Sequence, residues 1–184
     1  MKERPILFSG PMVQAILGGR KTMTRRVIKF PYIEIRDDGI LASEYHEPGT
    51  ERPSGLCHKV TCPYGPPGDR LWVRETYFNG VGPGMEPGFY YQADHVGQYL
   101  SCPWKSSFFM PRHRSRITLE ITAVRVERVQ DIGDEDAEAE GLSWCNAASP
   151  RDKFQCLWNS LNAKRGYGWE ANPWVWVIAF KRVK

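Results

Sequence analysis

The segment 116–129, RITLEITAVRVERV, constrains the fold more than any other part of the chain. In its first half one side carries the apolar residues Ile117, Leu119, Ile121 and Ala123. The other side carries Glu120 between two threonines. This period of two is typical of a half-buried β-strand. The apolar positions then change parity at Val124, which predicts a bulge, as a strand that bends around a barrel requires.

Other segments of the chain alternate between strand and helix patterns. Residues 174–183 are apolar on both faces through Phe180, which predicts a central, fully covered strand near the C-terminus. The remaining elements that we expect are strands at 6–8 and 70–77, a helix at 11–17 that ends at Gly18-Gly19, an acidic helix at 134–140, and a helix that starts after Ser149.

Two long segments are rich in glycine and proline and weak in periodicity. They lie at about 31–65 and 78–115, and neither holds enough apolar residues for a core of its own. We therefore expect a single domain over residues 1–184, of class α+β, with two loop-rich insertions. Its sheet should be small and strongly bent, with residues 70–77, 116–129 and 174–183 in a barrel.

Charge is unevenly distributed along the chain, although the net charge is only +4. Residues 131–140 contain six acids and no lysine or arginine, whereas residues 20–29 and 112–116 are basic clusters without an acid. Clustered positive charge favours a phosphate-bearing partner such as a nucleotide or nucleic acid. No apolar run is long enough to cross a membrane and no export signal is evident, so we expect a cytoplasmic protein.

The segment GRKTMTRR at 19–26 carries the most chemical information. Lys21 and Thr24 are three residues apart in what we expect to be a tight cationic loop, so both can face one pocket. Burial and the neighbouring Arg25 and Arg26 would lower the pKa of Lys21 toward that of a useful base. A solvated basic loop is the alternative that composition alone leaves open.

The pattern Gly19-x-Lys21-x-x-Thr24-x-Arg26 resembles the signature of the ASCH domain family, including phage and prophage members. The resemblance continues, in the family's order, through GDRLWVRE at 68–75, the strand at 116–129, the acidic helix that ends in AEG, and VWVIAF near the C-terminus. It implies a PUA-like mixed β-barrel with short helices at the connections, and an association with RNA. The two insertions are not covered by it.

One branch of that family, the small bacterial N4-acetylcytidine amidohydrolases, uses a lysine, a threonine and a glutamate. KTMTRR is similar to its lysine–threonine segment and TLEIT at 118–122 to its glutamate strand, which implies Lys21, Thr24 and Glu120 as catalytic residues. Thr24 would be the nucleophile, Lys21 its general base, and Glu120 the group that passes a proton to the leaving amine. The family motifs imply Gly19, Arg26 and Arg74 as substrate-binding residues, and no cofactor.

The leading hypothesis is therefore a hydrolase that acts on an acylated amine of a modified cytidine or related nucleoside. The alternative is a non-catalytic RNA- or DNA-binding module of phage origin, or a ribonuclease. The hydrolase hypothesis makes a geometric demand: Lys21 Nζ, Thr24 Oγ1 and a Glu120 carboxylate oxygen must meet around one pocket. A Glu120 that points to open solvent, far from Lys21, would overturn the hydrolase hypothesis built on these three residues and leave only the barrel.

Cysteines and aromatic residues in the insertions leave further alternatives open. Cys57, His58, Cys62 and Cys102 have a spacing that suits zinc ligands, but the paired C-x2-C spacing of common zinc sites is missing, so we expect no metal. The insertion at 78–115 carries Tyr90, Tyr91, Trp104 and Phe108. These rings either form a satellite cluster under a long loop or lie exposed and stack on bases.

Overall fold

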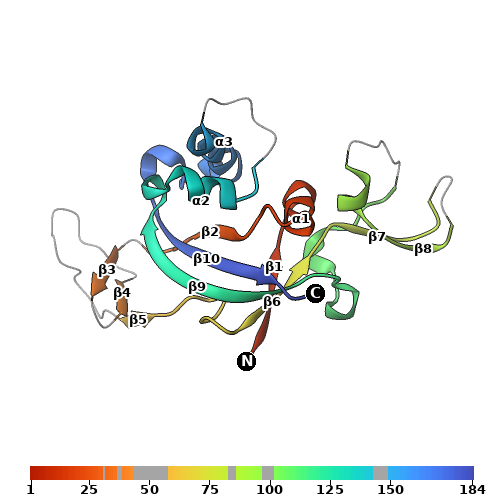
Figure 1. Ribbon diagram of the computed structural model, residues 1–184, viewed down its shortest axis with the longest axis horizontal. Coiled ribbons are helices and arrows are strands. Elements are labelled where there is room, and N and C mark those ends of the chain that lie inside the picture. The colour runs from red at the N-terminus through yellow and green to blue at the C-terminus, as the bar shows by residue number, and fades with distance from the viewer. Residues whose placement is uncertain (31, 37–38, 44–57, 83–85, 97–101, 143–148) are drawn as a thin grey trace.

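One mixed five-stranded sheet organises the protein (Figure 1). The computed structural model describes all residues except 31, 37–38, 44–57, 83–85, 97–101 and 143–148. In order across the sheet, the strands are β1 (Glu3–Leu7), β6 (Arg70–Arg74), β9 (Thr118–Arg128), β10 (Trp174–Arg182) and β2 (Met23–Val27). The β1–β6 pair is parallel and the other pairs are antiparallel, so the class is α+β, as predicted.

Strand β10 is covered on both faces, which explains its unbroken apolar sequence. On one face Trp176, Ile178 and Phe180 belong to the larger core cluster, together with residues of β1, β6, β9 and helix α1 (Gly10–Leu17). We call this the inner face of the sheet. On the opposite, outer face, Val175 and Val177 pack under helices α2 (Asp134–Ala139) and α3 (Pro150–Asn162).

The predicted irregularity in the long strand is confirmed. Strand β9 pairs Ala123 with Ala179 but Ile121 with Phe180, so the register shifts by one residue at this point. The bulge returns Ile121 to the inner face, where it is 1% exposed. It also fixes Glu120 on the outer face, beside Lys181 of β10.

The helices begin and end where the sequence predicts. In α1, Pro11 occupies the first turn and Gly18 follows the last residue. In α3 the Ser149 hydroxyl accepts a hydrogen bond from the Asp152 backbone N–H, as an N-cap does. Short 3₁₀ turns lie at Gln92–His95, Ser107–Phe109, Arg112–Arg114, Val129–Asp131, Ala163–Arg165 and Trp169–Ala171.

Each predicted insertion holds a small sheet of its own, and Figure 1 shows the two at opposite ends of the molecule. The first is formed by β3 (Tyr32–Arg36), β4 (Gly39–Ser43) and β5 (His58–Val60), and the second by β7 (Tyr77–Gly80) and β8 (Gly88–Tyr91). The described pairings leave β1 and β2 at the two ends of the five-stranded order, so closure into a PUA-like barrel stays a prediction.

Two expectations need correction. The strand expected at 70–77 ends at Arg74, and Tyr77 instead begins β7, which pairs with β8 in a separate sheet. Thr24, which we expected in a loop, lies within strand β2. Among the described residues, no helix is long and apolar enough to cross a membrane.

Candidate active site

Lys21 is the centre of an unusual buried cluster. It follows the end of α1, where its backbone N–H bonds to the Ala15 carbonyl oxygen, and its own backbone pairs with Glu140 at the end of α2. The Lys21 Nζ donates to Glu140 Oε2 at 2.6 Å, to the Met23 carbonyl oxygen at 2.8 Å and to the Glu140 carbonyl oxygen at 3.0 Å. The two side chains are 0% and 3% exposed. An ion pair withdrawn this far from water carries a large desolvation cost.

A second cation, Arg25, ties this pair to the acidic helix. Strand alternation places Arg25 on the outer face opposite Val177, under α2 and α3. Its guanidinium contacts three carboxylates, Glu127 at 2.6 Å, Asp136 at 2.7 Å and Glu140 at 3.3 Å. Glu140 therefore presents one carboxylate oxygen to Lys21 and the other to Arg25, which fixes its orientation.

The environment of Lys21 shifts its protonation equilibrium. Burial removes the ammonium from water and lowers the pKa of Lys21 below its ordinary value, and the nearby charges of Arg26 and Arg25 act in the same direction. The Glu140 carboxylate opposes this through its charge and its hydrogen bond. The lowered pKa agrees with the expectation drawn from the cationic sequence, and lowered lysine pKa values are a frequent property of functional sites.

Gly141 lets the end of α2 approach Lys21. Its φ of +77° is a left-handed conformation that glycine adopts readily. A Cβ atom at this position would lie 2.7 Å from the Lys21 Cβ and 2.8 Å from the Ala15 Cβ. The glycine therefore gives both the turn and the space that the Lys21–Glu140 pair requires.

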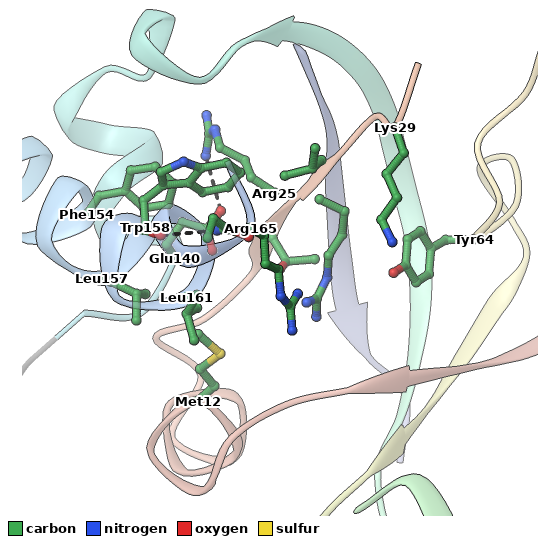
Figure 2. A pocket seen from close by; sticks show the side chains of 14 residues that line it. Met12, Arg25, Lys29, Tyr64, Glu140, Phe154, Leu157, Trp158, Leu161 and Arg165 are labelled. Atoms are coloured by element: carbon green, nitrogen blue, oxygen red, sulfur yellow. Dashed lines mark hydrogen bonds and ion pairs between the residues drawn. The ribbon is translucent and has the colours of Figure 1, made fainter. Parts of the chain in front are cut away.

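A pocket of about 350 Å³ opens beside the buried pair (Figure 2). Thr24, Arg26 and Glu140 are among its lining residues. The other lining residues are Phe154, Leu157, Trp158, Leu161 and Asn162 of α3, Arg165 after it, Met12 of α1, and Arg25, Val27, Lys29 and Tyr64. Figure 2 shows Met12 beside Leu161, and Lys29 and Tyr64 across from α3. Because β2 is an edge strand, residues from both of its faces can border this space. The volume is within the range of small-molecule sites.

The structure brings together some of the predicted site residues. Thr24 and Arg26 line the pocket, and Lys21 lies directly behind Glu140. The Arg26 guanidinium lies 5.3 Å from the centre of the Phe8 ring and donates to the Leu7 carbonyl oxygen at 2.8 Å. Gly19 has a φ of +73° and allows the turn from α1 toward Lys21, but it is not among the pocket-lining residues.

Glu120 and Arg74 lie elsewhere. Thr24 is opposite Ile178 on the inner face, whereas Glu120 is opposite Lys181 on the outer face, so the sheet separates the two side chains. The Glu120 carboxylate binds Lys181 Nζ at 2.8 Å, and this hydrogen bond, together with the charge of the lysine, lowers the pKa of Glu120. Arg74 stacks on Trp72 instead of bordering the pocket. The predicted meeting of Glu120 with Lys21 and Thr24 is not formed.

The carboxylate at the site is Glu140, which the sequence analysis did not single out. Two signals were present in the sequence. Glu140 is the last acid of the acidic helix, and it precedes Gly141 in the AEG segment that resembles the ASCH pattern. A glutamate at the end of an acidic helix suggests a solvated side chain, and the backbone bridge and side-chain hydrogen bond between Lys21 and Glu140 show that the two residues meet.

Only part of the possible zinc-ligand set lies within the described residues. Cys57 and the side chain of His58 lie outside the described part, and Cys62 and Cys102 are half-buried. The described residues contain no group of three or more metal-ligating side chains.

Comparisons with known proteins give two distant structural similarities. The sequence matches no family model and no curated protein. The structure is similar to an ASCH domain from Lactobacillus crispatus JV V101, with 12% identity and a TM-score of 0.46 over 99% of this chain and 80% of that one. It is also similar to a DUF984 protein from Enterococcus faecalis V583, with 12% identity and a TM-score of 0.44 over 100% of this chain and 81% of that one.

Proposed function

We propose that this protein is a hydrolase that removes an acyl group from the amine of a modified cytidine or a related nucleoside, with Thr24, Glu140 and Lys21 as its reactive group. The observation that carries the proposal is the buried Lys21–Glu140 pair at 2.6 Å, which borders a nucleoside-sized pocket that Thr24 also lines. Glu120 does not take part, so the hydrolase hypothesis stands here on a different carboxylate from the one that the sequence suggested.

In this reaction Thr24 is the nucleophile. Its Oγ forms a bond to the acyl carbon while its proton passes through a water in the pocket to the Glu140 carboxylate, and the acyl C–N bond then breaks. Glu140 returns the proton to the departing amino nitrogen, which leaves the free amine and an acyl ester on Thr24. Water attacks this ester, with Glu140 again taking and returning a proton, and releases the carboxylic acid and the original Thr24.

Lys21 acts through Glu140. Its Nζ is fully buried and is not part of the pocket lining, so the pocket-facing member of the pair is the carboxylate. Because burial lowers the pKa of Lys21, a proton can be shared between Nζ and Glu140 at a smaller cost than between an exposed lysine and glutamate. Lys21 is therefore a positioning residue that holds the Glu140 carboxylate at the pocket.

A second function, non-catalytic binding of a nucleotide or nucleic acid, is supported by the charge of the pocket. Its lining includes Arg26, Lys29 and Arg165, whereas its lining carboxylate, Glu140, is already bound by Lys21 and Arg25. Cations of this kind suit phosphate groups. The two functions predict different outcomes in one assay.

That assay incubates the protein with N4-acetylcytidine and follows the release of cytidine. We expect turnover by the wild-type protein, loss of turnover in Thr24→Val, and retention of measurable turnover in Thr24→Ser, which keeps a hydroxyl nucleophile. Thermal unfolding of both variants checks that the fold is intact. A folded wild-type protein that binds cytidine or its acetylated form but releases no cytidine contradicts the hydrolase and supports the binding function.

A further inference from the structure

A second surface, away from the pocket, combines arginines with exposed aromatic rings. It consists of Trp72, Arg74, Phe108, Phe109 and Arg112, which we call the Arg–aromatic patch. None of the five lines the pocket. Trp72 and Arg74 alternate with the inner-face residues Leu71 and Val73 of β6, so they lie on the outer face of the sheet. The other three residues come from the second insertion, a segment for which the sequence left two alternatives open.

The patch is held together by contacts between cations and rings. The Arg74 guanidinium carbon lies 4.6 Å from the centre of the Trp72 ring and 5.8 Å from the centre of the Phe108 ring. The guanidinium carbon of Arg112, which comes from the 3₁₀ turn Arg112–Arg114, lies 5.8 Å from the centre of the same Trp72 ring. Such distances are within the range of cation–π attraction. Trp72, which is 8% exposed, thus anchors both arginines on the sheet.

Two rings of the patch project into solvent. Phe108 is 63% and Phe109 is 69% exposed, and their ring centres are 5.4 Å apart with the ring planes at 89°. Other rings of the same insertion behave differently: Tyr90 and Trp104 are half-buried against Phe78, as a satellite cluster requires. Packing within the insertion therefore explains Tyr90 and Trp104 but leaves Phe108 and Phe109 without an internal function.

The charge around these rings is positive and only partly neutralised, because Arg116 at the end of the segment binds Glu75 and Asp94. Residues 105–116, KSSFFMPRHRSR, contain no acid. Arg112 binds Glu3 at 2.9 Å, whereas the interactions described for Arg74 include no carboxylate, and its Nε is buried without a hydrogen-bond partner. The next arginine, Arg114, lies 4.9 Å from the Phe89 ring and extends the same alternation of cations and rings.

From this arrangement we infer that the Arg–aromatic patch binds a single-stranded nucleic acid. Bases have apolar faces that stack on exposed aromatic rings, and the phosphates between them require cations at short intervals. The patch offers both, with Phe108 and Phe109 as stacking surfaces, Arg74 beside Phe108, and Arg112 beside the Trp72 ring that Arg74 also contacts. An acidic protein segment would satisfy the arginines but would not require two solvent-exposed phenylalanines. The inference is independent of the proposed hydrolase.

The test measures binding of fluorescent oligo-U and oligo-dT of about 12 nucleotides by anisotropy, over a series of salt concentrations. We expect binding that weakens steeply with salt. Phe108→Ala and Phe109→Ala should each weaken it roughly tenfold, as the loss of a stacked base does. Arg74→Ala should reduce the slope of log affinity against log salt by about 0.7, the value for one phosphate contact on a single strand. The comparison of the two oligonucleotides shows whether the patch distinguishes RNA from DNA.

Arg151→Ala is the matched control. Arg151 is an exposed arginine whose guanidinium lies 5.4 Å from a tryptophan ring, that of Trp169, so this variant loses the same charge and the same kind of contact at a different place. It should leave affinity and salt slope unchanged. The inference is overturned if the wild-type protein binds neither oligonucleotide at low salt, or if the phenylalanine variants bind as the wild type does. It is also overturned if polyglutamate binds the patch as tightly as the oligonucleotides and without dependence on Phe108.

Discussion

Two glutamates of this protein each bind a lysine at nearly the same distance, yet their surroundings differ completely. Glu120 binds Lys181 at 2.8 Å on the outer face of the sheet, where the two side chains are 27% and 60% exposed. Glu140 binds Lys21 at 2.6 Å, where the two side chains are 3% and 0% exposed. Water screens the first pair and is excluded from the second.

The difference shows why contact alone does not identify a site. An exposed ion pair contributes little and perturbs its members weakly, because solvent competes for both charges. A buried pair is costly, depends on each partner being present, and shifts protonation equilibria. Glu140 also lines the pocket that Thr24 borders, and Glu120 is not among the residues of that lining.

The largest effect is expected on turnover. Glu140→Gln removes the group that moves the proton and should lower the release of cytidine from N4-acetylcytidine by about 10² to 10⁴, the usual contribution of a general acid–base. Glu120→Gln makes the same chemical change on the outer face and should retain wild-type turnover. If both variants keep their melting temperature and lose turnover equally, the two glutamates do not differ in function and the account is contradicted.

A large effect on stability is expected at Gly141. Gly141→Ala combines strain at a positive φ with contacts below 3 Å to Lys21 and Ala15, so we expect the free energy of unfolding to fall by about 2–3 kcal/mol in urea titrations. Gly166→Ala is the control, because Gly166 has a φ of +81° but open space around it. That variant should lose only about 1 kcal/mol. A smaller loss at Gly141 than at Gly166 contradicts the close approach.

The two arginines that the sequence predicted as substrate-binding residues, Arg26 and Arg74, should differ in their effect on the KM. Arg26 lines the pocket, so Arg26→Ala should raise the KM for the acetylated nucleoside about tenfold, the loss of one charged contact. Arg74 lies on the outer face, and Arg74→Ala should leave both kcat and KM for a free nucleoside unchanged. A raised KM in Arg74→Ala would place that residue at the substrate after all.

The smallest effect is a pH dependence of stability. Because the pKa of Lys21 is lowered on folding, the unfolded chain binds more protons than the folded one between this lowered value and the ordinary 10.5. Within that window the wild-type protein should therefore gain stability relative to Lys21→Met as the pH rises toward 10.5. Urea unfolding of both proteins from neutral to alkaline pH measures the difference between their free energies of unfolding. If the wild type instead loses stability relative to Lys21→Met as the pH rises, the pKa of Lys21 is raised on folding.

Local patterns predicted the elements of this fold well. The alternation around Glu120 predicted strand β9, and its change of parity predicted the bulge that the register shows. The serine–proline start of α3 and the glycines after α1 marked helix ends correctly. These features depend on neighbours in sequence, whose backbone geometry determines which side chains share a face.

The site was predicted only in part, because its members are brought together by long-range pairing. Thr24 and Arg26 follow from one local motif, and both border the pocket. The carboxylate depends on where the end of α2 meets the residues after α1, a contact between positions 119 residues apart. Strand alternation put Glu120 on a polar face correctly, but the sequence did not show that this face points away from Lys21.

The most direct measurement of the central claim, that Lys21 is coupled to Glu140 and not to Glu120, is a pair of double-mutant cycles. Urea unfolding of Lys21→Met, Glu140→Gln and their double variant should give a coupling energy of about 1–3 kcal/mol, as for residues in one buried network. The same cycle with Glu120→Gln in place of Glu140→Gln should give effects that add within measurement error. Additive effects for Lys21 and Glu140, or a clear coupling between Lys21 and Glu120, would contradict the account.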